Sequence, residues 1–449
     1  MKPPVSSEEA KIVKKITSLF NKNKIDEIAR KTGFVSRQRK LTGFVFVMLM
    51  IFEIRKTNME SLNEMSIKLE SEGIFISKQG IDNRFNETAV AFMKELTCNV
   101  LSAKLDRDEI LENAEFFNRI KVRDSTVFQL PAEYSEKYKG SGGGASEAGI
   151  KLQYEYNLKA NTGLDIELQS SCIPDNKSKL QDIQPKDLRI EDLGYFKLKR
   201  FGEIINSEAY FLSRLKYNIS AYSKDDDQFN LINIDKLVNK MKVGEKLELQ
   251  VYLGQKEKLP VRLILERVPD EVAAEKRRKI KTDKQNKRKN ISKGRLAFCD
   301  VNAYITNADQ DILPTDLIRS IYSLRWQIEI IFKTWKSTFN LDKVKQMKIQ
   351  RFDCINYGTL IQIMLCTKLY NYYKTTLWNK SAIELSELKS FQYLQKTMND
   401  MKIYIKDSQI KRITELLENT KETLGRKCRK ERKKGSITPM MIMSKIPLN

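Results

Sequence analysis

The spacing of apolar side chains changes at Ile120, and this change limits the possible folds of the chain more than any other feature. Residues 1 to about 115 are typical of helices and show little strand alternation. From Ile120 the segment IKVRDSTVFQLP alternates apolar and polar side chains until Pro131. Apolar residues recur about every 3.6 positions on a helix face and every second position on a strand. The sequence therefore predicts an α/β protein with a helical amino-terminal part.

More strand-like segments follow the first one. IKLQYEYNLKANTGLDIELQSS contains two alternating runs joined by ANTG, which predicts a hairpin. LRIEDLGYF and SEAYFLSRLKYNI predict two further short strands. KLELQVYLG and LPVRLILERV predict a separate β-rich piece within residues 221–300, and RLAFCDVNAYITN predicts a later strand. A buried helix, NYGTLIQIMLCTKLYNYY, is expected after these strands.

The charge balance indicates a polyanionic partner. Lys and Arg total 81 against 58 Asp and Glu, so the net charge is +23. Such an excess creates a positive potential that suits nucleic acid first and an anionic membrane surface second. Eleven basic residues and one acidic residue lie between Lys276 and Arg295. This density suits contact with a DNA backbone, although such a run is also typical of a solvated loop or helix.

Neither a membrane span nor a disulfide framework is expected. The longest apolar run, Leu41 to Phe52, has twelve residues, which is too short to cross a bilayer. The start of the chain, MKPPVSSEEAKIVKK, lacks an apolar signal core. The six Cys are scattered singly without a CxxC pair, so reduced thiols in a cytoplasmic protein are expected.

The chain contains no His at all. This excludes catalytic Ser-His-Asp and Cys-His sets, His general bases and the usual zinc-finger ligands. A hydrolytic enzyme of this composition would have to use carboxylates, together with a hard metal ion such as Mg²⁺.

A helix-turn-helix is predicted near residues 61–87, in SLNEMSIKLESEGIFISKQGIDNRFNETAVAFMKEL. Ser61 can cap a first helix, Gly73 ends it, and Ser77 can start a second. A plain helical hairpin would show the same signals. The second helix is expected to expose residues that can contact bases and phosphates, namely Lys78, Gln79, Asp82, Asn83 and Arg84.

The segment YSLRWQIEIIFKTWK predicts an amphipathic helix that begins near Thr315, the expected cap. One stripe of this helix is apolar and predicts contact with a core. Local Arg–Glu pairing, which stabilises a helix by only about 0.2–0.5 kcal/mol, is the simpler interpretation of its charges. At about 100° per residue, four polar side chains fall within an arc of about 60° along the border of the apolar stripe: Tyr322, Arg325, Glu329 and Lys336.

Other carboxylates are expected to meet Glu329. Asp124 lies inside the first predicted strand, where an acidic side chain is unusual unless it binds something. Asp192 lies at a strand-turn junction, where it could also simply stabilise a turn before Gly194. Two Asp and one Glu from separate elements are what a two-metal phosphoryl-transfer site requires, with two ions about 4 Å apart.

At these residues the chain resembles the bacterial DDE transposases of the insertion-sequence-four family. The family signature is Tyr, two residues, Arg, three residues, Glu, six residues, Lys, and it is complete here from Tyr322 to Lys336. RDSTVFQLP and EDLGYF…AYFLSRLK look like the first and second Asp regions of the family. ISKQGIDNRFN is similar to its amino-terminal DNA-binding part. The resemblance covers residues from about 60 to 375.

The resemblance implies a role for each matching residue. Asp192 is the least certain member of the acidic triad, because Asp165, Asp182 and Asp187 lie nearby. Relatives use a Trp of the insertion to stabilise a flipped base, and the insertion of this chain contains no Trp. The implied ligands of two Mg²⁺ or Mn²⁺ ions are Asp124, Asp192 and Glu329, and the implied phosphate contacts are Tyr322, Arg325, Lys336 and Arg214.

The resemblance also implies the domain organisation. It predicts an α/β fold with a ribonuclease-H-like catalytic core, interrupted by a β-rich insertion. A helical DNA-binding domain would precede the core, and a helical region with a basic tail would follow it. The predicted ranges are 1–115 for the DNA-binding domain, 116–220 and 301–375 for the core, 221–300 for the insertion, and 376–449 for the carboxyl-terminal region.

The expected function is that of a transposase that binds the inverted-repeat DNA ends of an insertion sequence. With Mg²⁺ it would cleave a phosphodiester and join the freed 3′-hydroxyl to target DNA. The resemblance implies a homodimer on double-stranded DNA, in the bacterial cytosol and associated with the nucleoid. Two alternatives stay open: a non-enzymatic helix-turn-helix regulator, and a related nuclease that cuts without joining.

Overall fold

The computed structural model describes most of the chain as a mixed α/β protein. Residues 143–145 lie outside the described residues. So do residues 287–290, which belong to the basic run, and residues 432–436, which belong to the basic tail. The described ranges are 7–37, 40–53, 61–103, 116–142, 146–160, 162–177, 182–226, 228–286, 291–407, 409–431 and 437–446.

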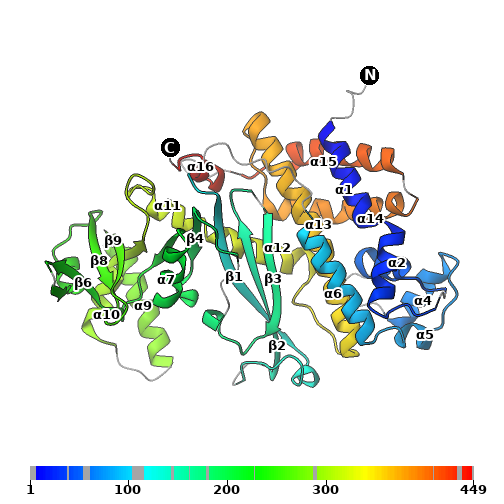
Figure 1. The fold of residues 1–449 in the computed structure, drawn as a ribbon, viewed down its shortest axis with the longest axis horizontal. Helices are drawn as coiled ribbons and strands as arrows, with labels where there is room; N and C mark the ends of the chain where they lie inside the picture. Colours follow the sequence, from blue (N-terminus) through cyan, green and yellow to red (C-terminus); the bar gives the residue numbers. More distant parts are fainter. Residues whose placement is uncertain are drawn as a thin grey trace.

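A single sheet of ten strands runs through the described part of the chain, in the order β3-β2-β1-β4-β5-β10-β9-β8-β6-β7. Figure 1 shows β1–β3 in the middle of the molecule, β6, β8 and β9 at one end, and a block of helices at the other. The strands are β1 (Arg119–Leu130), β2 (Ala148–Asn157), β3 (Thr162–Ser170), β4 (Asp187–Glu191), β5 (Tyr210–Arg214), β6 (Ala221–Asp225), β7 (Gln228–Leu231), β8 (Lys246–Leu253), β9 (Leu259–Arg267) and β10 (Val301–Thr306).

The first three strands form as the alternation predicts. β1 ends at Leu130, directly before Pro131, which cannot donate a ladder hydrogen bond. β2 pairs antiparallel with both β1 and β3, so the hairpin prediction is confirmed. β4 pairs parallel with β1, and β5 pairs parallel with β4. The carboxyl ends of β1, β4 and β5 therefore point in the same direction.

Two predictions about the insertion are wrong. Its strands do not form a separate β-rich piece, because β9 pairs with β10 and β10 pairs with β5. The insertion thus extends the sheet that carries β1. The segment RLAFCDVNAYITN is a strand only from Val301, whereas its first residues lie in α10 (Lys293–Ala297) and a 3₁₀ turn. Ser292 caps that short helix by accepting a hydrogen bond from the backbone N–H of Arg295, a local contact that overrides the alternation.

Helices from both ends of the chain pack together. α6 packs against α13, and α1 packs against α15 (Figure 1). The predicted buried helix lies within α13 and is confirmed. The domain ranges themselves stay a prediction. The helices are α1 (Ser7–Leu19), α2 (Lys22–Lys31), α3 (Gly43–Met48), α4 (Leu62–Glu70), α5 (Lys78–Asp82), α6 (Glu87–Ser102), α7 (Leu198–Asn206), α8 (Ile234–Val238), α9 (Asp270–Asn286), α10, α11 (Ile318–Ser323), α12 (Trp326–Phe339), α13 (Ile349–Ser381), α14 (Glu387–Lys406), α15 (Ile410–Lys427) and α16 (Pro439–Met443).

The predicted helix-turn-helix corresponds to α4 and α5. Ser61 and Glu64 form a reciprocal capping box at the start of α4. Gly73 has a positive φ of 78°, which ends the first helix at low steric cost. Ser77 caps α5 through the backbone N–H of Gly80. These start and stop signals are confirmed, but α5 has only five residues.

A buried network of charged side chains joins β1, β2 and β4. Asp187 accepts hydrogen bonds from Nε and Nη2 of Arg119 at 2.7 and 2.6 Å. Lys121 Nζ lies 3.3 Å from Asp187 and 3.4 Å from Glu155, and Arg189 Nη2 lies 2.5 Å from Glu155. Asp187 is fully buried and Arg189 is 1% exposed. The network fixes β4 against β1. β1 contains Asp124, and β4 ends directly before Asp192.

Within the described residues, every helix is too short or too polar to cross a membrane.

Candidate active site

Asp124 lies in the middle of β1 and Asp192 directly follows β4, and these two strands are neighbours in the sheet. Arg123 of β1 is paired in parallel register with Glu191, the last residue of β4. The next residue on each segment is therefore Asp124 or Asp192. Asp192 caps a 3₁₀ turn and accepts a weak hydrogen bond of 3.4 Å from the Gly194 N–H. The turn-stabilising interpretation of Asp192 is thus correct, and it leaves the other carboxylate oxygen for the site.

Glu329 comes from a helix that differs from the predicted one. The expected single helix is broken at Leu324–Arg325 into α11 and α12. Thr315 does not cap it, because its hydroxyl donates to Glu248 and accepts a hydrogen bond from Arg262. Competition from the charged pair in the adjacent strands explains this wrong prediction. The break puts Glu329 in the first turn of α12, where the helix dipole favours an acidic side chain.

Arg325 brings the three predicted carboxylates together. Its Nη1 lies 2.8 Å from Glu329 Oε1 and 3.6 Å from Asp124 Oδ2, and its Nε lies 3.5 Å from Asp192 Oδ1. One guanidinium group thus contacts acidic side chains from a strand, a turn and a helix that lie 205 residues apart at most, from 124 to 329. This convergence is the condition on which the predicted site depends.

The donor set fits a divalent ion in its chemistry. Three carboxylates supply the hard oxygen ligands that Mg²⁺ prefers. Among the described residues, however, no cluster of three or more acidic or cysteine side chains is arranged to coordinate an ion as it stands. Arg325 lies between the carboxylates instead. Binding of an ion to Asp124, Asp192 and Glu329 would therefore require the Arg325 guanidinium to move away from the carboxylates.

Burial raises the pKa of Asp124 to about 6. Desolvation is the largest cause, and the negative charges of Asp192 and Glu329 act in the same direction. The Ser125 backbone N–H, which donates to Asp124 at 2.8 Å, and the charge of Arg325 act in the opposite direction. The fold thus holds this carboxylate in its ionised form at a cost in stability.

Replacing Asp124 by Asn is expected to stabilise the protein in EDTA at pH 8, by about 1–3 kcal/mol. Because the pKa is raised on folding, the wild type loses stability as the pH rises from about 4 to about 6, whereas Asn does not titrate. Urea unfolding of both proteins, below pH 4 and at pH 8, measures the difference in the free energy of unfolding. The two proteins should be equally stable below pH 4, and equal stability at pH 8 would contradict the account.

The remaining signature residues surround the carboxylates. The Tyr322 hydroxyl is buried, accepts or donates no hydrogen bond within the described residues, and has a pKa raised to about 12, chiefly by burial. The Arg214 guanidinium carbon lies 5.6 Å from the centre of the Tyr322 ring. Lys336 Nζ donates to the Val127 carbonyl at 3.1 Å, across from β1. Arg325, Tyr322 and Arg214 therefore lie close to the acidic triad, whereas the described contact of Lys336 is with the backbone of β1, three residues beyond Asp124.

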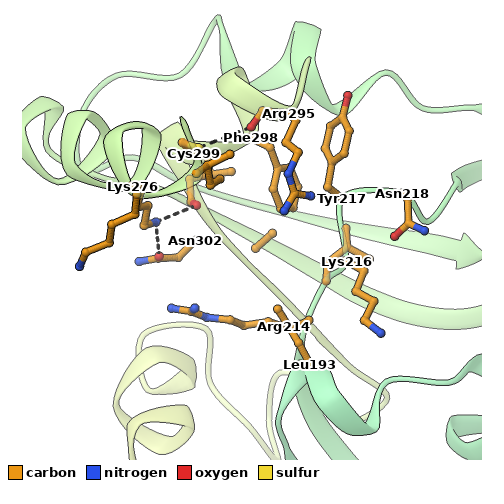
Figure 2. Close-up of a pocket in the computed structure, with 15 residues that line it drawn as sticks. Leu193, Arg214, Lys216, Tyr217, Asn218, Lys276, Arg295, Phe298, Cys299 and Asn302 are labelled. Carbon is orange, nitrogen blue, oxygen red and sulfur yellow. Dashed lines mark hydrogen bonds between the residues drawn. The ribbon is translucent and has the colours of Figure 1, made fainter. Parts of the chain in front are cut away.

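A cavity of about 500 Å³ lies beside the site, and its lining includes Leu193, which follows Asp192, and Arg214, which faces Tyr322. Figure 2 shows Arg214 and Leu193 on one side of it, Lys276 and Asn302 on another, and Arg295 beside Phe298 and Tyr217. Lys276 Nζ donates to the Val301 carbonyl at 3.1 Å and to Asn302 Oδ1 at 2.8 Å. Burial, with the charge of Arg214 as a second cause, lowers its pKa to about 8.

The lining of this cavity combines five basic residues with apolar and aromatic walls and contains no carboxylate. The sequence analysis included Lys276, Lys279 and Arg295 only as members of a basic run and assigned no role to Lys216 or Tyr217. The density of Lys and Arg in the run that follows β9 indicates the first three, whereas Lys216 and Tyr217 follow β5, outside that run.

The predicted DNA-reading residues differ in exposure. Lys78, Gln79 and Asn83 are exposed. Arg84 is not exposed as predicted, because its Nη2 lies 3.3 Å from the Phe34 carbonyl and 3.5 Å from that of Leu41. Its guanidinium also lies over the Phe34 ring, at 4.5 Å from the centroid. These two backbone carbonyl groups and the Phe34 ring thus hold the side chain inward.

Several known proteins are similar to this chain. Residues 115–365 match the family described as "Transposase DDE domain". The chain is 33% identical over 458 residues to the transposase for insertion sequence element IS1151 of Clostridium perfringens, covering 96% of each chain. It is 32% identical over 391 residues to that for IS231B of Bacillus thuringiensis subsp. berliner, covering 83% of this chain and 82% of the relative. A solved piggyBac transposase synaptic complex with hairpin DNA is similar with a TM-score of 0.42 at 10% identity, covering 90% of this chain and 84% of that one. The family match spans more than half of the chain, and the chain belongs to the DDE transposase family.

Proposed function

We propose that this protein is the transposase of a bacterial insertion sequence, which binds the inverted-repeat ends of its element, cleaves them and joins them to target DNA. The observation that carries the proposal is the convergence of Asp124, Asp192 and Glu329 on one guanidinium group. Its relatives are named as transposases for insertion sequence elements. The net charge of +23 suits a polyanionic substrate.

The catalytic core is proposed to be ribonuclease-H-like. Support comes from the strand order β3-β2-β1-β4-β5, in which the first three strands are antiparallel and β4 and β5 run parallel to β1. In this arrangement the catalytic Asp residues lie on the adjacent central segments. The third carboxylate comes from a helix after the insertion, which explains the long interval between Asp192 and Glu329.

Each residue of the site has a chemical role in this proposal. Asp124, Asp192 and Glu329 would hold two Mg²⁺ or Mn²⁺ ions, which supply activation of the attacking oxygen and charge stabilisation of the leaving oxygen. In the first reaction a water oxygen bonds to phosphorus and the bond to the 3′-oxygen breaks, so a 3′-hydroxyl is freed. In the second reaction that hydroxyl attacks a target phosphodiester, with one phosphorus–oxygen bond formed and one broken.

The basic residues would hold the DNA during both reactions. Arg325 can grip a phosphate with two parallel hydrogen bonds, and Lys336 supplies a point charge. Arg214 connects the triad to the cavity of Figure 2. Because the cavity combines cations with aromatic and apolar walls, we propose that it accommodates a nucleotide of the bound strand next to the cleaved bond.

The exposed residues of α5 are proposed to contact the terminal repeats, and their replacement tests this. Lys78→Ala should weaken binding about equally for all DNA sequences and lower the slope of log affinity against log salt by about 1. Gln79→Ala should instead reduce discrimination at one base pair, by about 1–3 kcal/mol. Fluorescence anisotropy over a salt series measures both. Lys94→Ala, which removes an exposed Lys from α6, is the control, and equal effects at Lys78 and Lys94 would contradict the assignment.

Incubation with labelled DNA ends tests the function as a whole. With Mg²⁺ we expect strand breaks at the ends and, with a pre-cut end, joining to a target plasmid. Binding without breaks would favour the helix-turn-helix regulator, and breaks without joining would favour a nuclease. Native mass spectrometry with DNA tests the proposed homodimer that pairs two ends. Action on chromosomal DNA places the proposed function in the bacterial cytoplasm.

A further inference from the structure

Arg325 occupies the centre of the acidic triad, but its contacts there are poor. Only the contact to Glu329 has a length typical of a charge-assisted hydrogen bond, at 2.8 Å. The contacts to Asp124 and Asp192 are 3.6 and 3.5 Å long. The Nε atom is buried and has no hydrogen-bond partner among the residues that the structure describes. The guanidinium is therefore held by net charge more than by matched hydrogen bonds.

The position of Arg325 in the chain also opposes a permanent role there. It lies at the amino-terminal end of α12, where the helix dipole disfavours a cation. It also lies at the break between α11 and α12, outside the regular part of either helix. Three carboxylates offset this cost while they carry no other cation. The same end of a helix favours an anion such as a phosphate.

We propose that Arg325 is a removable counter-ion, which neutralises Asp124, Asp192 and Glu329 before divalent ions bind and turns to the DNA phosphate when they do. The inference rests on the proposed function. Two cations compete for the same three carboxylates, and they repel each other strongly in a poorly solvated site. Ion binding thus releases the phosphate-binding group, and phosphate binding removes the competitor of the ions. By linkage, each event strengthens the other.

Mn²⁺ binding without DNA tests the competition. Free Mn²⁺ is measured by electron paramagnetic resonance for the full chain, so the readout does not depend on cleavage. Arg325→Ala is expected to bind Mn²⁺ at least about fivefold more tightly than the wild type. Arg325→Gln, of similar length but without charge, should show the same gain and serves if the Ala variant folds poorly. Unchanged or weaker binding in the folded variants would overturn the proposal, because Arg325 would then organise the ligands rather than compete for them.

Lys333→Ala is the matched control for charge. Lys333 is exposed on the same helix, and its Nζ lies 6.0 Å from the centre of the Trp326 ring. It has no contact with the triad within the described residues, so its removal should change Mn²⁺ affinity less than about twofold. A gain equal to that of Arg325→Ala would show a general field effect and would contradict direct competition.

DNA binding supplies the second arm of the test. Ca²⁺ in place of EDTA should tighten binding of DNA ends by the wild type, and Arg325→Gln should lose most of this gain. An equal gain in both proteins would overturn the coupling. Failure of the proposed function has a different signature: neither the wild type nor any variant would bind Mn²⁺ at the triad, and Glu329→Gln would leave Mn²⁺ binding unchanged.

Discussion

Glu329→Gln is expected to lower Mg²⁺-dependent cleavage of DNA ends by about a thousandfold or more while leaving end binding intact. Gln keeps the size of the side chain but removes the charge that a hard cation requires. A loss of about 4 kcal/mol of transition-state stabilisation corresponds to this decrease. The backbone of α12 should not change, because Gln has the same length as Glu and its amide oxygen can still accept the hydrogen bond from Arg325.

The measurement compares single-turnover cleavage rates with binding affinity on the same labelled ends. Glu422→Gln is a suitable control, since Glu422 is 70% exposed and pairs only with Arg426 on α15 among the described contacts. The control should cleave at the wild-type rate. Cleavage by Glu329→Gln at the parental rate would show that this carboxylate takes no part in the reaction.

Asp187→Asn is expected to produce the largest loss of stability, about 3–5 kcal/mol. It removes the negative charge next to Arg119 and Lys121, and it leaves Lys121, which is 1% exposed, with Glu155 as its remaining acidic partner among the described contacts. Buried ion pairs contribute little net stability. Removal of one partner is nevertheless strongly destabilising, because the buried charge of the other partner is then poorly compensated. The effect should also reach the active site, because Asp187 begins the strand that leads to Asp192.

Urea unfolding measures this change, with Asp182→Asn as the matched control. The Asp182 carboxylate also binds Arg119, but it is 59% exposed and should contribute no more than about 1 kcal/mol. Asn tolerates the positive φ of this residue, so the control adds no backbone strain. Equal unfolding midpoints for the two variants would contradict the role of the buried network.

Local signals predicted the secondary structure around the site well. Alternation and Pro131 predicted β1, the ANTG turn predicted the β2–β3 hairpin, and Ser61 predicted the start of α4, because each depends on neighbouring residues only. The approach of Asp124, Asp192 and Glu329 to one another followed from residue types and from the family signature. The structure agrees with this approach, since all three contact Arg325.

Long-range contacts explain what the sequence could not predict. Lys121, Arg123 and Glu155 alternate with apolar residues as on a solvated strand face, yet they are buried. β4 supplies partners of opposite charge to Lys121 and Glu155, and β2 and β3 supply those of Arg123. The break at Leu324–Arg325 lies where Arg325 meets Asp124 and Asp192, which are distant in sequence. Arg84 turned inward to carbonyl groups about 40–50 residues away. None of these contacts can be predicted from the spacing of apolar and polar residues along the sequence.

The central claim is that three remote carboxylates bind divalent ions for DNA cleavage. Anomalous diffraction from crystals of the protein with Mn²⁺ and a DNA end tests it most directly. The account predicts Mn²⁺ density between the carboxyl groups of residues 124, 192 and 329, with the guanidinium of residue 325 on a phosphate. Mn²⁺ bound elsewhere, with that guanidinium still among the three acids, would contradict it.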